Sequence, residues 1–177
     1  MRKTISIFIL FLTFLFIYFL QANFFNWFTI AGIMPNLFVI FILFISLYAG
    51  IKVGLPFGII VGLYLDIIMG KNIGTSAIML GVVSVIGAYL EKNFSKESKI
   101  TILLMVIAVT AIYEIGSYIL QIARLSIHIE PQYFLIRLAI EALYNVMITI
   151  ILYPIIQKFG YKIENIFKGN KILTRYF

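Results

Sequence analysis

Long, continuous runs of apolar residues dominate the chain, and short polar stretches separate them. A helix needs about 20 apolar residues to cross the hydrocarbon core of a bilayer, and these runs have about that length. The first run follows two basic residues, but it is longer than the apolar core of a signal peptide and no small-residue cleavage motif follows it. We therefore predict an all-α integral membrane protein with one domain, residues 1–177, and six transmembrane helices at residues 4–22, 36–50, 53–70, 74–90, 100–123 and 132–157.

The composition of the 177 residues supports a membrane protein and excludes several other classes. Hydrophobic residues make up 63% and charged residues 12%, which leaves too little polar surface to cover a water-soluble domain. The chain has no cysteine and one histidine, His128, so thiolate and histidine-cluster metal sites are excluded. The net charge of +7 does not indicate a nucleic-acid partner, because the basic residues lie between the apolar runs and not on one soluble face.

Lysine and arginine residues divide unequally between the two ends of the predicted helices. One set of ends holds only Lys71 and Arg124, and Arg137 lies inside a predicted helix. The opposite ends hold the rest of the 14 basic residues: Arg2, Lys3, Lys52, Lys92, Lys96, Lys99, Lys158, Lys162, Lys168, Lys171 and Arg175. Cytoplasmic loops of membrane proteins are enriched in these residues. The sequence therefore predicts that both termini are cytoplasmic.

Two segments outside the predicted helices carry aromatic or basic residues. Residues 23–34 form the first external connection, are uncharged and contain the only tryptophan, Trp27. Amphipathic aromatic rings settle at the membrane–water interface, so we expect this segment to lie there. Residues 158–177 form a basic cytoplasmic tail that mixes Lys and Arg with Ile, Phe and Tyr. This mixture is typical either of a surface helix bound to anionic lipids or of a disordered tail.

Glycine recurs at every fourth position along the third predicted helix. Residues four apart share a helix face, so these glycines form a smooth groove that allows another backbone to approach closely. Two interpretations remain open: packing against helices of the same chain, and a groove for a partner's helix or a ligand. The predicted groove residues are Gly50, Gly54, Gly58 and Gly62, with Gly74 and Gly81 of the fourth helix.

Ionisable side chains inside the apolar runs are costly to bury and are therefore candidates for function. At about 1.5 Å per residue, Asp66 and Arg137 lie at matching depths, and Arg137 is long enough to reach Glu114 as well. We expect the polar faces of the fifth and sixth helices to turn inward toward Asp66. Three acidic groups face one basic group, and we expect Glu141 to be the carboxyl group that takes up a proton.

This intramembrane polar cluster is compatible with three roles. It forms a structural network, a site for a substrate or a proton, or a contact with a partner's transmembrane helix. Its predicted members are Asp66, Glu114, Arg137, Glu141 and Asn145.

No pattern in the sequence indicates an enzyme. His128 lies in a short loop without a matched base or nucleophile, and no glycine-rich phosphate-binding loop is present. We therefore expect no catalytic residue, no bound metal and no cofactor.

Several motifs along the chain resemble one known family. A basic N-terminus and a single apolar run precede the stretches GIMPNLFVIFILFISLYAG and GLPFGIIVGLYLDIIMGKNIGTSA. Along its whole length, the chain resembles the rod shape-determining protein MreD family. The residues that carry the resemblance are Pro35, Asn36, Gly58, Gly62, Leu63, Asp66, Gly70, Gly74 and Ala77.

The resemblance implies a non-enzymatic subunit of the bacterial cell-elongation machinery, in the cytoplasmic (inner) membrane, that supports peptidoglycan synthesis. The partners that it implies are a bitopic MreC-like protein, a RodA-type glycan polymerase with its class B penicillin-binding transpeptidase, and the actin-like MreB. It also implies a fold like that of the substrate-binding subunits of energy-coupling-factor transporters. Binding of a small, vitamin-type solute is therefore the alternative function.

Overall fold

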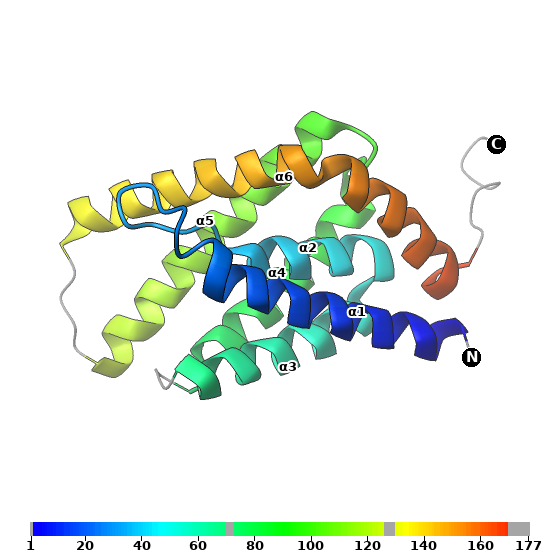
Figure 1. The fold of residues 1–177 in the computed structure, drawn as a ribbon, viewed down its shortest axis with the longest axis horizontal. Helices are drawn as coiled ribbons and strands as arrows, with labels where there is room; N and C mark the ends of the chain where they lie inside the picture. The colour runs from blue at the N-terminus through cyan, green and yellow to red at the C-terminus, as the bar shows by residue number, and fades with distance from the viewer. Residues whose placement is uncertain (1, 70–72, 126–129, 170–177) are drawn as a thin grey trace.

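A computed structural model describes residues 2–69, 73–125 and 130–169, and Figure 1 shows them as a helical bundle. Within these residues the chain forms six α-helices and one short π-helix. The elements are α1 (Arg2–Phe19), the π-helix η1 (Leu20–Phe24), α2 (Leu37–Ala49), α3 (Ile51–Met69), α4 (Thr75–Asn93), α5 (Lys99–Leu125) and α6 (Pro131–Phe167). These helices occupy the six predicted apolar runs, and the main difference is that α6 continues beyond residue 157 to Phe167.

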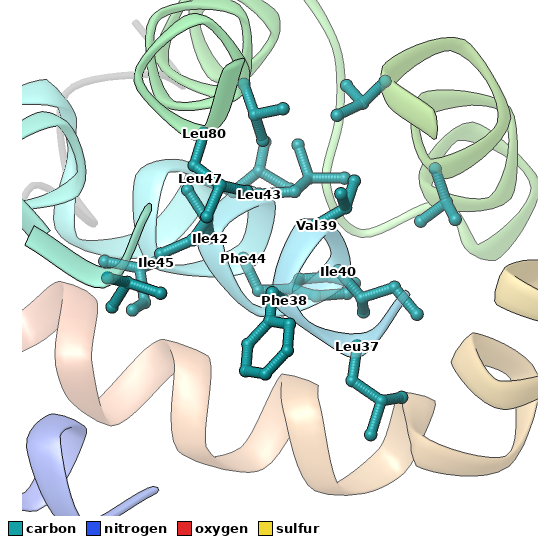
Figure 2. Packing of buried hydrophobic residues seen from close by; sticks show 14 of the residues in the cluster. Leu37, Phe38, Val39, Ile40, Ile42, Leu43, Phe44, Ile45, Leu47 and Leu80 are labelled. Carbon is teal, nitrogen blue, oxygen red and sulfur yellow. The ribbon is translucent and has the colours of Figure 1, made fainter. Parts of the chain in front are cut away.

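Helix α2 lies at the centre of the bundle, and nearly all of its side chains are buried. It is apolar on every face, which is the pattern of a helix that other helices surround. Figure 2 shows Leu43 of α2 beside Leu80 of α4 in the resulting core. Asn36 caps the start of α2 by accepting a hydrogen bond from the Val39 amide at 3.3 Å. Gly50 ends the helix at a φ of +81°, which favours glycine.

Helices α3 and α4 pack very closely, because glycines of α3 leave room for a neighbouring backbone. A Cβ atom added at Gly58 would lie 2.8 Å from the carbonyl oxygen of Leu80, and one added at Gly62 would lie 2.5 Å from the amide nitrogen of Ala77. Gly54 faces α2 in the same way. Glycines at this spacing of four therefore contact other helices of the same chain.

The other glycines of the predicted groove lie elsewhere. Gly74 precedes α4 in a left-handed conformation with a φ of +96°. Gly81 faces α3 more loosely, since a Cβ atom added there would lie 3.4 Å from Cγ1 of Ile59. The six glycines therefore do not form one surface. Gly81 instead belongs to a shallow apolar groove between α3 and α4, lined by Leu55, Ile59, Ala77, Ile78, Gly81, Val82, Val85 and Ile86.

The end of α6 is fixed to the ends of α2 and α4 by charged side chains. Nζ of Lys168 donates a hydrogen bond to the carbonyl oxygen of Leu47 at 2.9 Å and lies 3.1 Å from Oε1 of Glu91. Lys96 forms an ion pair with Glu164 of α6. Burial lowers the pKa of Lys168, and its hydrogen bond with Glu91 opposes that shift. The first part of the predicted basic tail is thus helical and packed on the bundle, whereas residues 170–177 lie outside the described residues.

The helices support an integral, all-α membrane protein. Among the described residues, five helical segments are long and apolar enough to cross a membrane: α1 together with η1, α3, α4, α5 and α6. Helix α2 has 13 residues and is about 20 Å long, which is shorter than the hydrocarbon thickness of about 30 Å. Six membrane crossings, with both termini in the cytoplasm, therefore stay a prediction.

Fusions to a topology reporter test this prediction. The start of α1 and the end of α6 lie at the same end of the bundle (Figure 1), as an even number of crossings requires. We expect a reporter that is active only outside the cytoplasm to be inactive after Lys96 or Phe177, and active beside Trp27 or His128. Of these sites, His128 and Phe177 lie outside the described residues. Activity after Phe177 would contradict the six-crossing topology.

Candidate functional site

Asp66 is buried near the end of α3, where its carboxylate caps the N-terminus of α4. The carboxylate accepts hydrogen bonds from three backbone amides, those of Gly74 at 2.8 Å, Ser76 at 3.1 Å and Ala77 at 3.3 Å. Gly74, at the N-cap position of α4, has no side chain to satisfy these amides. The positive end of the helix dipole adds to the attraction. Asp66 thus joins two helices that are adjacent in the chain.

The matching depths of Asp66 and Arg137 predict an ion pair between them, and this prediction is wrong. Among the described residues, the ion pair of Arg137 is with Glu114 of α5, with 3.9 Å between Nη2 and Oε2. The side chain of Arg137 is 51% exposed, whereas that of Glu114 is almost completely buried. The physical reason is that α4 supplies three backbone donors to Asp66, and these replace a cationic partner. The polar faces of α5 and α6 therefore do not converge on Asp66.

Glu114 and Glu141 bring α5 and α6 together inside the bundle. Their carboxyl groups interact with each other, and Glu141 also interacts with the side chain of Asn36 at the start of α2. Glu141 is only 3% exposed, and its Oε1 atom has no hydrogen-bond partner among the described residues. Glu114 thus lies near both Arg137 and Glu141, and Glu141 lies near the start of α2; that these residues form a functional cluster stays a prediction.

Asn145, one turn beyond Glu141 on α6, links three parts of the bundle. Its Oδ1 atom accepts a hydrogen bond from the backbone amide of Asn36 at 2.7 Å, and its Nδ2 atom donates to Oγ1 of Thr110 on α5 at 3.0 Å. The preceding residue, Tyr144, donates from its hydroxyl group to the carbonyl oxygen of Phe28 at 2.6 Å. The polar face of α6 therefore holds the segment that leads into α2.

Gln21 has a similar role that the sequence analysis missed. Its Nε2 atom donates to the carbonyl oxygen of Pro35 at 2.7 Å, and its Oε1 atom accepts from the amide of Leu37 at 3.1 Å. A signal was present in the sequence, because Gln21 is an amide side chain at the end of an otherwise apolar run, and a polar group there requires a partner.

These polar contacts position helices relative to one another. In the described part of the chain, no group of three or more His, Cys, Asp or Glu residues is placed to hold a metal ion. Asp66, Asn145 and Gln21 each bond to backbone atoms that an interrupted helix leaves without partners. The expectation of no catalytic residue and no cofactor stays a prediction.

Comparison with known proteins identifies the family of the chain. The family model described as rod shape-determining protein MreD matches residues 1–163. The chain belongs to the MreD family. No curated protein and no solved structure matches the chain in the corresponding searches. The resemblance seen in the sequence is thereby confirmed.

Membership in the MreD family indicates in what kind of protein these polar residues lie. MreD proteins are membrane proteins that determine rod shape, and they act in the rod-shape complex with MreC and related proteins. The apolar helices of this chain agree with such a multi-pass membrane protein. The buried polar contacts join the helices of this protein to one another.

Proposed function

We propose that the chain is a non-enzymatic scaffold subunit of the bacterial cell-elongation machinery in the cytoplasmic membrane. It holds a bitopic MreC-like protein next to a RodA-type glycan polymerase and its class B penicillin-binding transpeptidase, and MreB lies on the cytoplasmic side of the same assembly. The observation that carries the proposal is the match of the MreD family over residues 1–163.

The structure supports a scaffold by what its polar residues do. Inside the bundle, Asp66, Asn145 and Gln21 are hydrogen-bonded to backbone atoms of the chain itself. Much of the exposed surface is apolar, including the exposed face of α1 and the groove between α3 and α4. Association of helices in a membrane depends on close packing of such surfaces. A partner with a single transmembrane helix therefore has apolar surface to bind.

Complementation and copurification test the proposed function together. In a rod-shaped bacterium that lacks its own MreD, we expect the tagged chain, expressed with the MreC-like protein of its own genome, to restore rod shape. Purification through the tag should recover the MreC-like protein. Round cells despite normal membrane levels of the chain, with no MreC-like protein recovered, would contradict the scaffold.

The same purified sample tests the alternative function. A vitamin-type ligand that stays bound through purification needs a Kd of about 1 μM or lower, which is about −8 kcal/mol of binding free energy. Native mass spectrometry of the chain would show such a ligand as a stoichiometric mass increase. We expect no such increase, and its presence would favour the transporter function.

A further inference from the structure

The connection between α1 and α2 lies at an unexpected depth in the bundle. The amide of Asn36, where α2 begins, is bonded to Asn145. Asn145 is 14 residues beyond Pro131, the first residue of α6, and therefore about 21 Å from the start of that helix. The part of α6 before Asn145 thus extends beyond the start of α2, and Figure 1 shows the connection alongside this part of α6. Helix α2 is about 20 Å long, so it would leave about 10 Å of a hydrocarbon core of about 30 Å uncrossed.

Side chains of the protein pair with four backbone groups of the connection and of the start of α2. Tyr144 donates to the carbonyl oxygen of Phe28, and Asn145 accepts from the amide of Asn36. Gln21 of η1 bonds to the backbone on both sides of Asn36, at Pro35 and Leu37. Water satisfies such groups in an aqueous loop without help. Inside hydrocarbon, non-helical backbone is tolerated only where the protein itself supplies the partners.

A tight turn in the connection satisfies its own backbone. Ile30 and Ile33 exchange both backbone hydrogen bonds, at 3.0 and 2.9 Å. The two residues between them, Ala31 and Gly32, have positive φ angles of +52° and +76°. This is the pattern of a type I′ turn, which closes a chain reversal within four residues. The turn therefore adds no unpaired group at Ile30 or Ile33.

The side chains of the connection divide into two sets. Phe25 and Ile33 are buried against the bundle, and the ring of Phe25 lies 6.3 Å from that of Tyr144. Trp27 is 88% exposed, and Phe28 is also exposed. No charged residue occurs between residues 23 and 34. The exposed aromatic surface continues the apolar surface of α1, where large side chains are exposed along most of the helix: Phe8, Phe11, Leu12, Phe16 and Phe19.

We propose that residues 25–36 are embedded in the bilayer, in the half away from the lysine-rich end of the bundle. There they complete the crossing that α2 begins, with Trp27 in contact with lipid. The segment is uncharged, and the side chains of Gln21, Tyr144 and Asn145 pair with some of its backbone groups, which lowers the cost of its leaving water. Its exposed aromatic rings gain by contact with acyl chains and headgroups.

Fluorescence of Trp27 tests the proposal directly, since it is the only tryptophan of the chain. The protein is reconstituted into phosphatidylcholine–phosphatidylglycerol vesicles whose acyl chains carry bromine at a shallow or a deep position. We expect emission at shorter wavelengths than that of tryptophan in water, quenching by both brominated lipids with the shallow one stronger, and little quenching by acrylamide. Strong acrylamide quenching without lipid quenching would overturn the proposal. Absence of both kinds of quenching would overturn it too, because a second copy of the chain would then cover Trp27.

Two relocated tryptophans calibrate the measurement. The variant with Trp27→Phe and Phe16→Trp places the probe on the exposed face of α1 and should be quenched more by the deep bromines. The variant with Trp27→Phe and Phe94→Trp places the probe directly after α4, at an exposed position among lysines, and should be quenched by acrylamide. Trp27 must resemble the lipid probe more than the loop probe for the proposal to hold.

A matched pair of tyrosine variants tests why the segment tolerates this depth. Tyr144→Phe removes the hydroxyl group that pairs with the carbonyl oxygen of Phe28 and keeps the ring. We expect the Trp27 emission to move to longer wavelengths and its acrylamide quenching to rise, because the unpaired carbonyl group draws the segment toward water. The control Tyr133→Phe, at an exposed position of α6, should change neither quantity. Equal spectra for both variants would show that the segment does not depend on its side-chain partners.

Discussion

Gly62→Ala is expected to destabilise the bundle by about 1–3 kcal/mol, even though alanine is the better helix former by up to about 1 kcal/mol. The added methyl group would lie 2.5 Å from both the amide nitrogen of Ala77 and the carbonyl oxygen of Ser76. Backbone atoms of α4 cannot rotate away as a flexible side chain does. The two helices must therefore separate, and both lose dispersion contacts along their length. Loss of helicity during denaturation in mixed detergent micelles measures the change in the free energy of unfolding.

Gly81→Ala is the matched control for this prediction. Gly81 also lies within a helix of the same pair, but its nearest neighbour would be Cγ1 of Ile59, at 3.4 Å. A side-chain atom at this distance yields by a few tenths of an ångström, so we expect Gly81→Ala to be neutral or slightly stabilising. Equal destabilisation by both substitutions would mean that α3 and α4 do not approach each other as closely as the structure shows.

The helices of this protein could be predicted from the sequence because the length of an apolar run is a local property. Asn36 and Gly50 bound α2 in the structure much as they bound the second apolar run. The sequence also placed Gly58 and Gly62 on one face of α3, because a spacing of four is a property of every helix. Which neighbour fills that groove is not a local property. In the structure, α4, the next helix in the chain, packs against Gly58 and Gly62.

The polar contacts were harder to predict, because depth in the membrane does not decide which groups meet. Asp66 and Arg137 match in depth along their helices, but Asp66 accepts hydrogen bonds from the amides at the start of α4. A count of charged residues could not identify these amides, because it considers only side chains as partners. Gln21 was missed for the same reason, since its partners are backbone atoms of the connection to α2. In a membrane, the unpaired backbone of an interrupted helix needs a polar partner, and a buried polar side chain can supply it.

Asp66→Asn is expected to be the most damaging substitution among the buried polar residues. The carboxylate accepts from three amides, whereas an asparagine side chain has one carbonyl oxygen and an NH2 group that cannot accept. At least one buried amide at the start of α4 is left without a partner, at a cost of about 1–3 kcal/mol each. The lost negative charge at the helix N-terminus adds about 0.3–1 kcal/mol. The same micelle denaturation assay reports the loss, and restoration of rod shape reports its effect on function.

The variant Arg137→Gln distinguishes two roles of Asp66: capping the N-terminus of α4, and forming a buried ion pair with Arg137. Arg137 is half exposed and lies 3.9 Å from Glu114, so we expect its replacement to cost less than about 1 kcal/mol. Since Asp66 and Arg137 share no contact in the structure, the effects of Asp66→Asn and Arg137→Gln should add in the double variant, within about 0.5 kcal/mol. A buried pair predicts the opposite, because removal of the second partner then relieves the charge stranded by removal of the first. Recovery of stability in the double variant would therefore show that Asp66 interacts with the polar residues of α5 and α6. Additive effects would instead support Asp66 as the cap of α4.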